Sequence, residues 1–167
     1  KGVVCVFSRL HPLLDQDSIL SGAGEVITVG PTVSIDLSIS PDEQSSQFRK
    51  GHRYEIRRAK REGLTCHHDP HFEKLDAFID VYSRTMDRVD ADELYLFGRA
   101  YFSSLAEKLQ DVLHLFYCEL AGELACAGLF TLCDGIVQYH LSGTSEALRG
   151  LAPTKLMIDE VRLWATE

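Results

Sequence analysis

The pattern of apolar and polar residues along the chain changes its period twice. Residues 32–38, Thr-Val-Ser-Ile-Asp-Leu-Ser, alternate apolar and polar positions, which predicts a half-buried strand. Between residues 41 and 110, apolar positions instead recur every three or four residues, the spacing of amphipathic helices. From residue 112 onward, three apolar runs separated by short turns again predict strands. The sequence therefore predicts an α/β (α+β) domain in which helices precede an antiparallel meander.

Local signals predict where the helices begin and end. Residues 40–43, Ser-Pro-Asp-Glu, combine a cap residue, a proline at the first helical position and a glutamate three residues after the cap. A helix starting there would continue through Phe48, Ile56 and Ala59 and stop at Glu62-Gly63. A short strand is expected at residues 64–68. Asp69-Pro70 would then open a second helix, whose buried stripe would be Phe72, Leu75, Phe78, Ile79, Tyr82 and Met86.

A third helix is expected at about residues 99–110, before the meander of residues 112–120, 124–133 and 136–141. Asp134-Gly135 between the last two strands is a strong hairpin signal. A loop of small residues, 142–153, follows. A final helix from Thr154 would bury Leu156, Met157, Val161 and Trp164.

The first thirty residues predict a strand, a loop and a strand, which is too little chain for a core of its own. Since the chain begins with Lys1, we interpret it as a piece of a longer protein. No apolar stretch approaches the roughly 20 residues that cross a bilayer, so no transmembrane helix is expected. Five cysteines without a CxxC pair favour a reducing cytoplasm.

The charge of the chain is unevenly distributed. The net charge of -8 argues against a protein coated for nonspecific nucleic-acid binding. Residues 49–61 nevertheless hold seven basic residues and one acid, a local charge of +6 that leaves -14 elsewhere. The positive charge is therefore concentrated on one predicted helix.

Four segments together resemble the Fem-type (FemAB-like) peptidoglycan aminoacyltransferases, and the order of elements is similar to the first two thirds of the GNAT acyltransferase fold. The segments are Thr-Val-Ser-Ile-Asp-Leu-Ser (32–38), Arg-Tyr-Glu-Ile-Arg-Arg-Ala-Lys-Arg-Glu-Gly (53–63), Tyr-Ser-Arg-Thr-Met-Asp-Arg with Tyr-Leu-Phe (82–88 and 95–97) and Tyr-His-Leu-Ser-Gly-Thr (139–144). The resemblance covers roughly residues 31–167.

This resemblance implies a mixed central sheet flanked by helices. Family members carry two GNAT-like units in tandem, so residues 1–30 would be the tail of a preceding unit. Residues 31–167 would be a GNAT-like domain that is C-terminally incomplete and lacks its last strands. A sheet truncated in this way would favour a homo-oligomer formed through its exposed edge.

The resemblance also implies transfer of an acyl or aminoacyl group to an amine. The donor would be acyl-CoA or aminoacyl-tRNA, with no tightly bound cofactor, and in the Fem case the acceptor is a cell-wall precursor. Two alternatives stay open. One is an acetyl-CoA-dependent N-acetyltransferase acting on a small molecule or polysaccharide precursor, and the other is a noncatalytic binding module of the same fold.

The loop before the last predicted helix is the candidate donor site. Backbone N–H groups and the helix dipole at a helix start bind phosphate, and Arg149 can add a bidentate charged contact. The GNAT pattern has a basic residue followed by spaced small residues, and Pro153 departs from it by removing an N–H donor. The residues expected to hold donor phosphates are Arg149, Gly150, Ala152, Thr154 and Lys155. The alternative is an ordinary flexible connection.

Tyr139 and His140 end the third predicted strand beside that loop, and both can act in acid–base chemistry. Adjacent strand residues point to opposite faces, so only one would face a cleft. We prefer Tyr139 as an acid or substrate-orienting residue, although a packed strand tyrosine is the plain alternative.

Acceptor or nucleic-acid binding is expected at Arg53, Arg57, Arg88 and Tyr95. The alternatives are a solvated helix face for the first two and, for Arg88, an ion pair with one of the acids in residues 90–93. The run Cys-His-His-Asp-Pro-His (66–71) holds potential metal ligands, but adjacent histidines in an extended segment diverge, so no metal is expected.

Overall fold

The computed structural model describes residues 2–3, 5–20 and 22–167 and divides the chain into two units, Lys1–Ile35 and Asp36–Glu167. The described residues of the first unit form turns and extended segments without a helix or strand. The predicted strands there are wrong over these residues, and the predictions for residues 1, 4 and 21 lie outside them. Val29 and Val33 are 97% and 95% exposed, because the described residues of this unit form no sheet against which they could pack.

The strand predicted at residues 32–38 is also wrong. Its second half bends around Asp36, whose Oδ1 accepts hydrogen bonds from the Ser38 backbone N–H at 2.9 Å and from the Ser38 hydroxyl at 2.6 Å. Such a local side-chain turn competes with extended pairing. The alternation of apolar and polar residues alone therefore predicted a strand that residues 32–38 do not form.

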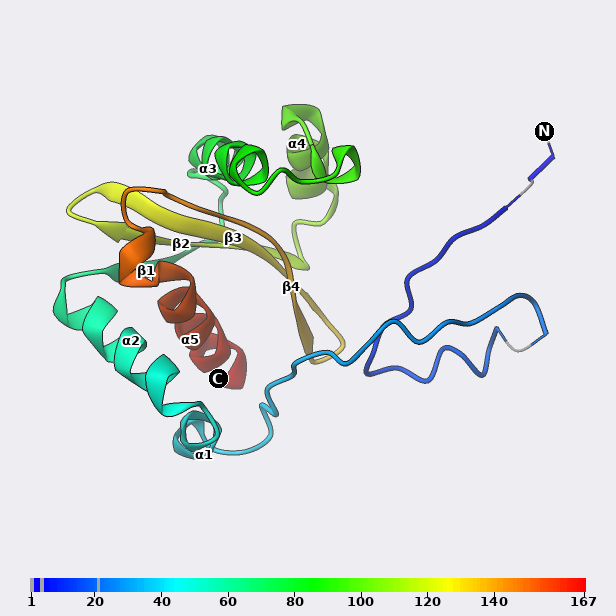
Figure 1. The fold of residues 1–167 in the computed structure, drawn as a ribbon, viewed down its shortest axis with the longest axis horizontal. Coiled ribbons are helices and arrows are strands. Elements are labelled where there is room, and N and C mark those ends of the chain that lie inside the picture. The colour runs from blue at the N-terminus through cyan, green and yellow to red at the C-terminus, as the bar shows by residue number, and fades with distance from the viewer. Residues whose placement is uncertain (1, 4, 21) are drawn as a thin grey trace. The chain divides into compact units, whose positions relative to one another are not determined.

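The second unit is built on a four-stranded sheet with the order β1-β2-β3-β4 (Figure 1). The strands are β1 (Thr65–Asp69), β2 (Leu113–Leu120), β3 (Glu123–Cys133) and β4 (Ile136–Thr144). All three pairings are antiparallel, so the sheet of the described residues is not mixed. The predicted meander is confirmed. Both hairpin turns, Ala121-Gly122 and Asp134-Gly135, have positive φ at their two central residues, as a two-residue type I′ turn requires.

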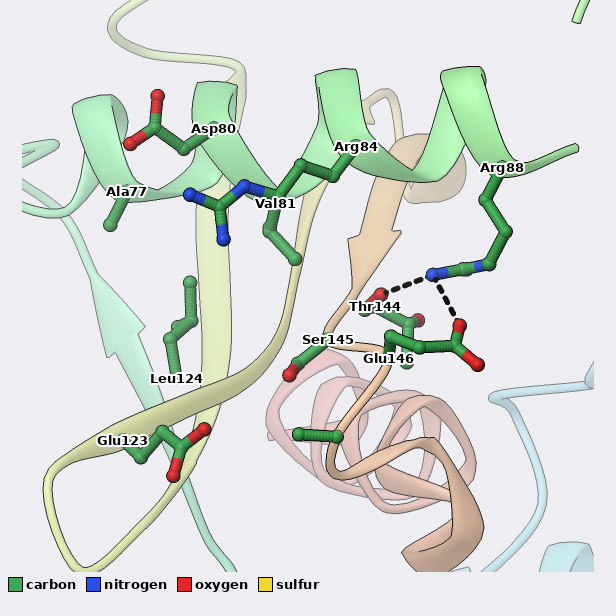
Figure 2. Close-up of a pocket in the computed structure, with 11 residues that line it drawn as sticks. Ala77, Asp80, Val81, Arg84, Arg88, Glu123, Leu124, Thr144, Ser145 and Glu146 are labelled. Atoms are coloured by element: carbon green, nitrogen blue, oxygen red, sulfur yellow. Dashed lines mark hydrogen bonds and ion pairs between the residues drawn. The ribbon is translucent and has the colours of Figure 1, made fainter. Parts of the chain in front are cut away.

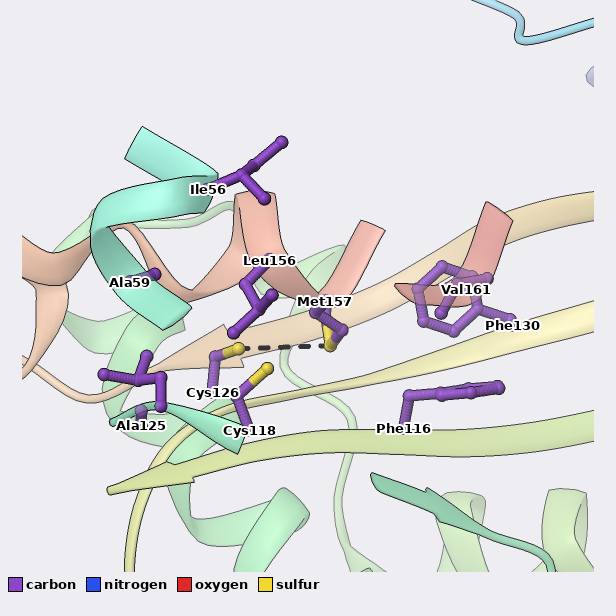
Figure 3. Close-up of a cluster of buried hydrophobic side chains, with 11 residues drawn as sticks. Ile56, Ala59, Phe116, Cys118, Ala125, Cys126, Phe130, Leu156, Met157 and Val161 are labelled. Carbon is purple, nitrogen blue, oxygen red and sulfur yellow. Dashed lines mark hydrogen bonds between the residues drawn. The ribbon is translucent and has the colours of Figure 1, made fainter. Parts of the chain in front are cut away.

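One face of the sheet packs against α2 (Lys50–Arg61) and α5 (Pro153–Thr166), with the short α1 (Pro41–Ser46) at the end of α2 (Figure 1). Figure 3 shows the core between them, in which Leu156 and Met157 of α5 lie over Cys126 and Phe116. The other face is covered by α3 (Leu75–Arg88) and α4 (Arg99–Lys108). The core on that side includes Phe78, Tyr82, Phe102, Leu115 and Leu129.

The helix predicted from Ser40 to Glu62 is two helices. The capping box of Ser40 and Glu43 is confirmed, but α1 ends at Ser46 and α2 begins at Lys50. The Arg53 guanidinium donates to the carbonyl oxygens of Ser45 and Ser46, at 3.3 and 2.8 Å, and satisfies the end of α1. The break therefore has its own side-chain support, which the apolar periodicity did not reveal.

The second predicted helix begins later than expected, at Leu75. The Asp69 carboxylate accepts hydrogen bonds from the backbone N–H groups of Glu73 and Lys74, and Phe72 has a left-handed φ of 56°. Asp69 thus holds a turn ahead of the helix.

Among the described residues, none of the helices combines the length and apolar character needed to cross a bilayer.

Candidate active site

The described sheet has two open edges, β1 and β4, and the β4 edge lies next to the predicted donor loop. Strand β4 pairs with β3, and no strand of the described chain pairs with its other side. Because successive backbone groups of a strand alternate in direction, part of the N–H and C=O groups of β4 face away from β3. A ligand lying along this edge could use them as hydrogen-bond donors and acceptors.

The edge strand leads directly into the start of α5. The strand extends to Thr144, further than predicted, so the connecting loop is shortened to residues 145–152 and contains the 3₁₀ turn η2 (Arg149–Leu151). The Thr144 and Thr154 hydroxyl oxygens lie 3.0 Å apart and join the end of the strand to the first turn of the helix. The dipole at a helix start favours anions, but Pro153 at the first position of α5 has no N–H and the Lys155 N–H already donates to the Ala152 carbonyl oxygen at 3.0 Å.

The predicted donor residues are only partly gathered at this helix start. Arg149 and Gly150 are exposed on η2. Ala152 is the residue before α5 and adopts a left-handed φ of 52°, an uncommon conformation for alanine. The Lys155 ammonium points away and forms an ion pair with Glu55 of α2. Arg149, Gly150, Ala152 and Thr154 therefore lie in the loop and at the start of α5, whereas the Lys155 side chain links α5 to α2.

Tyr139 and His140 contact opposite faces of the sheet. The Tyr139 ring stacks on Phe130 with centroids 5.2 Å apart, and its hydroxyl bonds Ser142. His140 Nε2 lies 3.3 Å from the hydroxyl of Tyr101 in α4. The pairing of β3 with β4 shifts register next to His140, which indicates a bulge there.

The environment of these two side chains moves their pKa values in opposite directions. Partial burial raises the pKa of Tyr139, although the Ser142 hydrogen bond lowers it in part. Burial lowers the pKa of His140. At neutral pH the phenol therefore stays protonated and the imidazole is mostly neutral, so the first can donate a proton and the second can accept one.

A cleft of 730 Å³ opens where α3, the start of β3 and the loop after β4 meet (Figure 2). Tyr139 and His140 do not line it, whereas Arg88 does. It also contains charged residues that the sequence did not single out, namely Asp80, Arg84, Glu123 and Glu146. Arg84 could have been found, because it lies one helical turn before Arg88. Glu123 and Glu146 come from a turn and a loop, whose direction no periodicity predicts.

The Arg88 guanidinium binds the end of β4. Its Nη1 atom donates to the Thr144 carbonyl oxygen at 3.0 Å and lies 3.2 Å from the Glu146 carboxylate. An ion pair with an acid in residues 90–93 was the alternative role expected for Arg88 from the sequence. Arg88 pairs instead with Glu146. Glu146 also lies 3.4 Å from Nη2 of Arg149, so it joins α3 to the candidate donor loop.

A close approach of two backbones fixes the position of α3 on β4. A Cβ atom at Gly143 would lie only 2.5 Å from the backbone of Val81 and Tyr82. Glycine at this position lets the helix sit directly on the strand, which brings Arg84 and Arg88 to the end of β4.

The four residues predicted to bind an acceptor or nucleic acid are not brought together. Arg53 supports the end of α1, and Arg57 is exposed on α2, on the sheet face opposite α3. Tyr95 belongs to the 3₁₀ turn η1 (Glu93–Tyr95), where its carbonyl oxygen accepts a hydrogen bond from Tyr82. Arg88 alone lines the cleft. Within the described part of the chain, no group of three or more histidine, cysteine, aspartate or glutamate side chains is placed to hold a metal ion.

Comparison with known proteins agrees with this architecture. Residues 46–167, well over half of the chain, match the family described as an acetyltransferase (GNAT) domain. The chain therefore belongs to the GNAT acetyltransferase family, and the predicted GNAT-like fold is confirmed.

A solved structure titled "Crystal structure of FemX" superimposes on the chain with a TM-score of 0.66 and 14% sequence identity. The match covers 77% of this chain and 48% of that one, so the chain spans about half the length of FemX. This likeness is one of fold, and it confirms the resemblance to a Fem-like GNAT-fold protein. No curated protein matched the chain.

Proposed function

We propose that the chain is an N-acyltransferase domain that transfers an acyl group from acyl-CoA to an amine. Membership of the GNAT acetyltransferase family supports a transferase. The observation that carries the proposal is the direct passage from the open edge of β4 through the Arg149 loop into the start of α5. It offers hydrogen-bond donors for an acyl carbonyl beside an anion-binding helix terminus.

The donor would lie along β4 with its phosphates at the loop. The N-terminus of α5 and the Arg149 guanidinium would hold the phosphates, with Gly150 allowing close approach of the backbone. Outward N–H groups of β4 would polarise the thioester carbonyl and stabilise the oxyanion that forms on attack. Most of the catalytic effect would then come from positioning.

The chemistry would be direct aminolysis. The amine nitrogen forms a bond to the carbonyl carbon, the carbon–sulfur bond breaks, and the released thiolate takes up a proton. Because the two side chains contact opposite faces of the sheet, only one of them would act at the reacting carbonyl. Either the protonated phenol of Tyr139, which we prefer, would supply a proton to the sulfur, or neutral His140 would accept the proton of the attacking amine. These roles are proposals for both residues.

The acceptor we propose is an amine of a cell-wall precursor peptide. The resemblance to Fem-type aminoacyltransferases supports this choice, and the alternative is a small molecule or polysaccharide precursor. Aminoacyl-tRNA is the alternative donor, for which the exposed basic side chains of α2, such as Arg57, would provide phosphate contacts.

Three further expectations accompany this function. Residues 1–30 are proposed as the tail of a preceding GNAT-like unit. The free edge of β4 is also proposed as the surface through which copies of the chain would associate when no donor lies along it, since an unpaired strand edge is a template for pairing. A reducing cytoplasm is the proposed location, because the described cysteines are free thiols.

The test is the binding of coenzyme A by calorimetry to the wild-type chain and to Arg149→Ala. Loss of a charged phosphate contact should weaken binding by about tenfold or more. Arg99→Ala is a matched control, because the Arg99 side chain is equally exposed at 61% and also pairs with a carboxylate. That carboxylate, Asp76, lies twelve residues before Arg88 on α3, roughly 18 Å along the helix.

Weaker binding in Arg149→Ala alone would support the donor site. Equal weakening in both variants would indicate a general charge effect, and absence of binding to the wild type would refute acyl-CoA as donor. A parallel titration with a trinucleotide that mimics the acceptor end of tRNA distinguishes the alternative donor.

A further inference from the structure

Two arginines from different elements converge on one carboxylate. Glu146 Oε2 lies 3.2 Å from Nη1 of Arg88 in α3, and Glu146 Oε1 lies 3.4 Å from Nη2 of Arg149 in the loop before α5. Each carboxylate oxygen therefore faces its own guanidinium. Two positive charges and one negative charge leave this cluster with an excess of one positive charge.

The cluster has one fixed and two mobile members. Arg88 is 25% exposed, and its Nη1 is held by the Thr144 carbonyl oxygen at 3.0 Å (Figure 2). The side chains of Arg149 and Glu146 are 61% and 62% exposed, so both can change rotamer at little cost. Arg88 thus provides a fixed cation at the end of β4, and Glu146 is the group most easily displaced from it.

The carboxylate occupies the position that a ligand anion would take. A phosphate group presents negative oxygens to a guanidinium in the same way as a carboxylate, and the contact is strong in both cases. The adjoining cleft of 730 Å³ falls within the size range of small-molecule sites. Arg84 also lines the cleft and forms no ion pair within the described residues, but Asp80 and Glu123 line it too, so the positive charge is local to the Arg88 end of the cleft.

We infer that Arg88 and Arg149 together form a binding site for a phosphate group of the donor, and that Glu146 fills this site as an internal competitor when no donor is bound. The inference rests on the proposed function, because it assigns the anion at Arg149 to the donor. Phosphate binding requires the Glu146 side chain to rotate into solvent. The apparent affinity for the donor is lowered by the fraction of molecules in which Glu146 occupies the site.

The test measures coenzyme A binding to the wild type, Glu146→Gln, Glu123→Gln and Arg88→Ala. Glu146→Gln should bind coenzyme A about threefold to tenfold more tightly, because an amide competes weakly for the two guanidinium groups. Glu123→Gln is the matched control, since it removes the same charge from the same cleft without contacting either arginine. Arg88→Ala should weaken binding by about tenfold, with thermal unfolding used to verify that the variant is folded.

The outcomes separate this inference from the proposed function. Tighter binding of coenzyme A by Glu146→Gln, but not by Glu123→Gln, supports the inference that Glu146 is an internal competitor. An unchanged affinity in Glu146→Gln, with Arg149→Ala still weakened, overturns the competitor and leaves the donor site standing. If both glutamine variants bind coenzyme A more tightly to the same extent, the effect is one of net charge, and the inference that Glu146 competes for the site is overturned. If none of the proteins binds coenzyme A, the proposed function itself fails.

Discussion

At the scale of single residues, the contact between His68 and His114 is the clearest feature that the sequence did not predict. His68 Nε2 lies 3.3 Å from His114 Nδ1, and both rings lie beside the indole of Trp164, at centroid distances of 5.3 and 4.6 Å. The two histidines are 46 residues apart and meet only because β1 pairs with β2. The spacing of potential ligands along the chain therefore could not predict this contact.

Burial lowers the pKa of both histidines. For His68 the neighbouring Asp69 opposes this effect, and for His114 the neighbouring His68 adds to it. A group whose folded pKa lies below its unfolded value binds fewer protons when folded, so its contribution to stability is present above the unfolded pKa and is lost as the pH falls. Acidification below about pH 6.5 should therefore lower the free energy of unfolding.

The corresponding prediction is that His114→Gln loses less stability than the wild type between about pH 7.5 and about pH 5.5. Urea unfolding at the two pH values measures the difference. His140, whose pKa burial also lowers, contributes equally to both proteins and cancels. His52→Gln, at an exposed position on α2, is the control for the loss of one histidine from the chain. The same pH dependence in His114→Gln as in the wild type would contradict the prediction.

The sequence predicted the orientation of Tyr139 and His140, but it did not predict the partner of Arg88. The period of two along a strand correctly predicted that Tyr139 and His140 would contact different faces. The partner of Arg88 was not predicted, because Glu146 is far away in sequence and lies on a loop whose path depends on tertiary packing.

At the scale of elements, the contact between α3 and β4 determines whether the candidate site is assembled. Gly143→Ala would place a Cβ 2.5 Å from backbone atoms of Val81 and Tyr82, which cannot rotate away. We predict destabilisation by about 1–3 kcal/mol, the usual range for overpacking. Coenzyme A binding should weaken as well, since α3 carries Arg88. Urea unfolding and calorimetry measure the two effects.

Gly51→Ala provides the contrast for this prediction. Nothing lies within 4 Å of a Cβ at Gly51, and the residue belongs to α2. Alanine there should stabilise the helix by about 0.5–1 kcal/mol. A Gly143→Ala variant as stable as the wild type would show that α3 can shift on the sheet and that its position is not fixed by this glycine.

The elements themselves were predicted best where a local signal fixes them. The capping box at Ser40 and the turn at Asp134-Gly135 are such signals, because cap and turn chemistry act within four residues. The break after Ser46 and the late start of α3 depend instead on Arg53 and Asp69, which reach across a turn to backbone groups. Periodicity does not report such contacts.

At the scale of the whole molecule, the GNAT fold was predicted from a family resemblance, carried by the order of elements and four sequence segments, and this prediction is confirmed. The first thirty-five residues were predicted worst. Apolar runs within residues 1–30 and the alternation at residues 32–38 indicated strands. Pairing is a property of two segments, however, and the described residues of this unit have no paired partner within it.

Both hydrophobic cores are built from residues between Phe48 and Trp164. We therefore predict that a chain of residues 36–167 has the same urea unfolding midpoint as residues 1–167. A shorter chain beginning at Lys50 should instead lose stability, because it removes Gln44, which is 1% exposed and whose Oε1 accepts a hydrogen bond from buried Arg162 at 3.1 Å.

Arg162 would keep its pair with Asp159, at 2.7 Å, but its Nη1 would lose both of its acceptors in the protein, Gln44 Oε1 and the Pro41 carbonyl oxygen. A buried N–H donor that is left without an acceptor costs about 1–3 kcal/mol of stability. The unfolding midpoint should therefore fall measurably only for the chain that begins at Lys50. Equal losses in both truncated chains would mean that residues 1–35 stabilise the folded domain. That result would argue against treating residues 36–167 as self-sufficient.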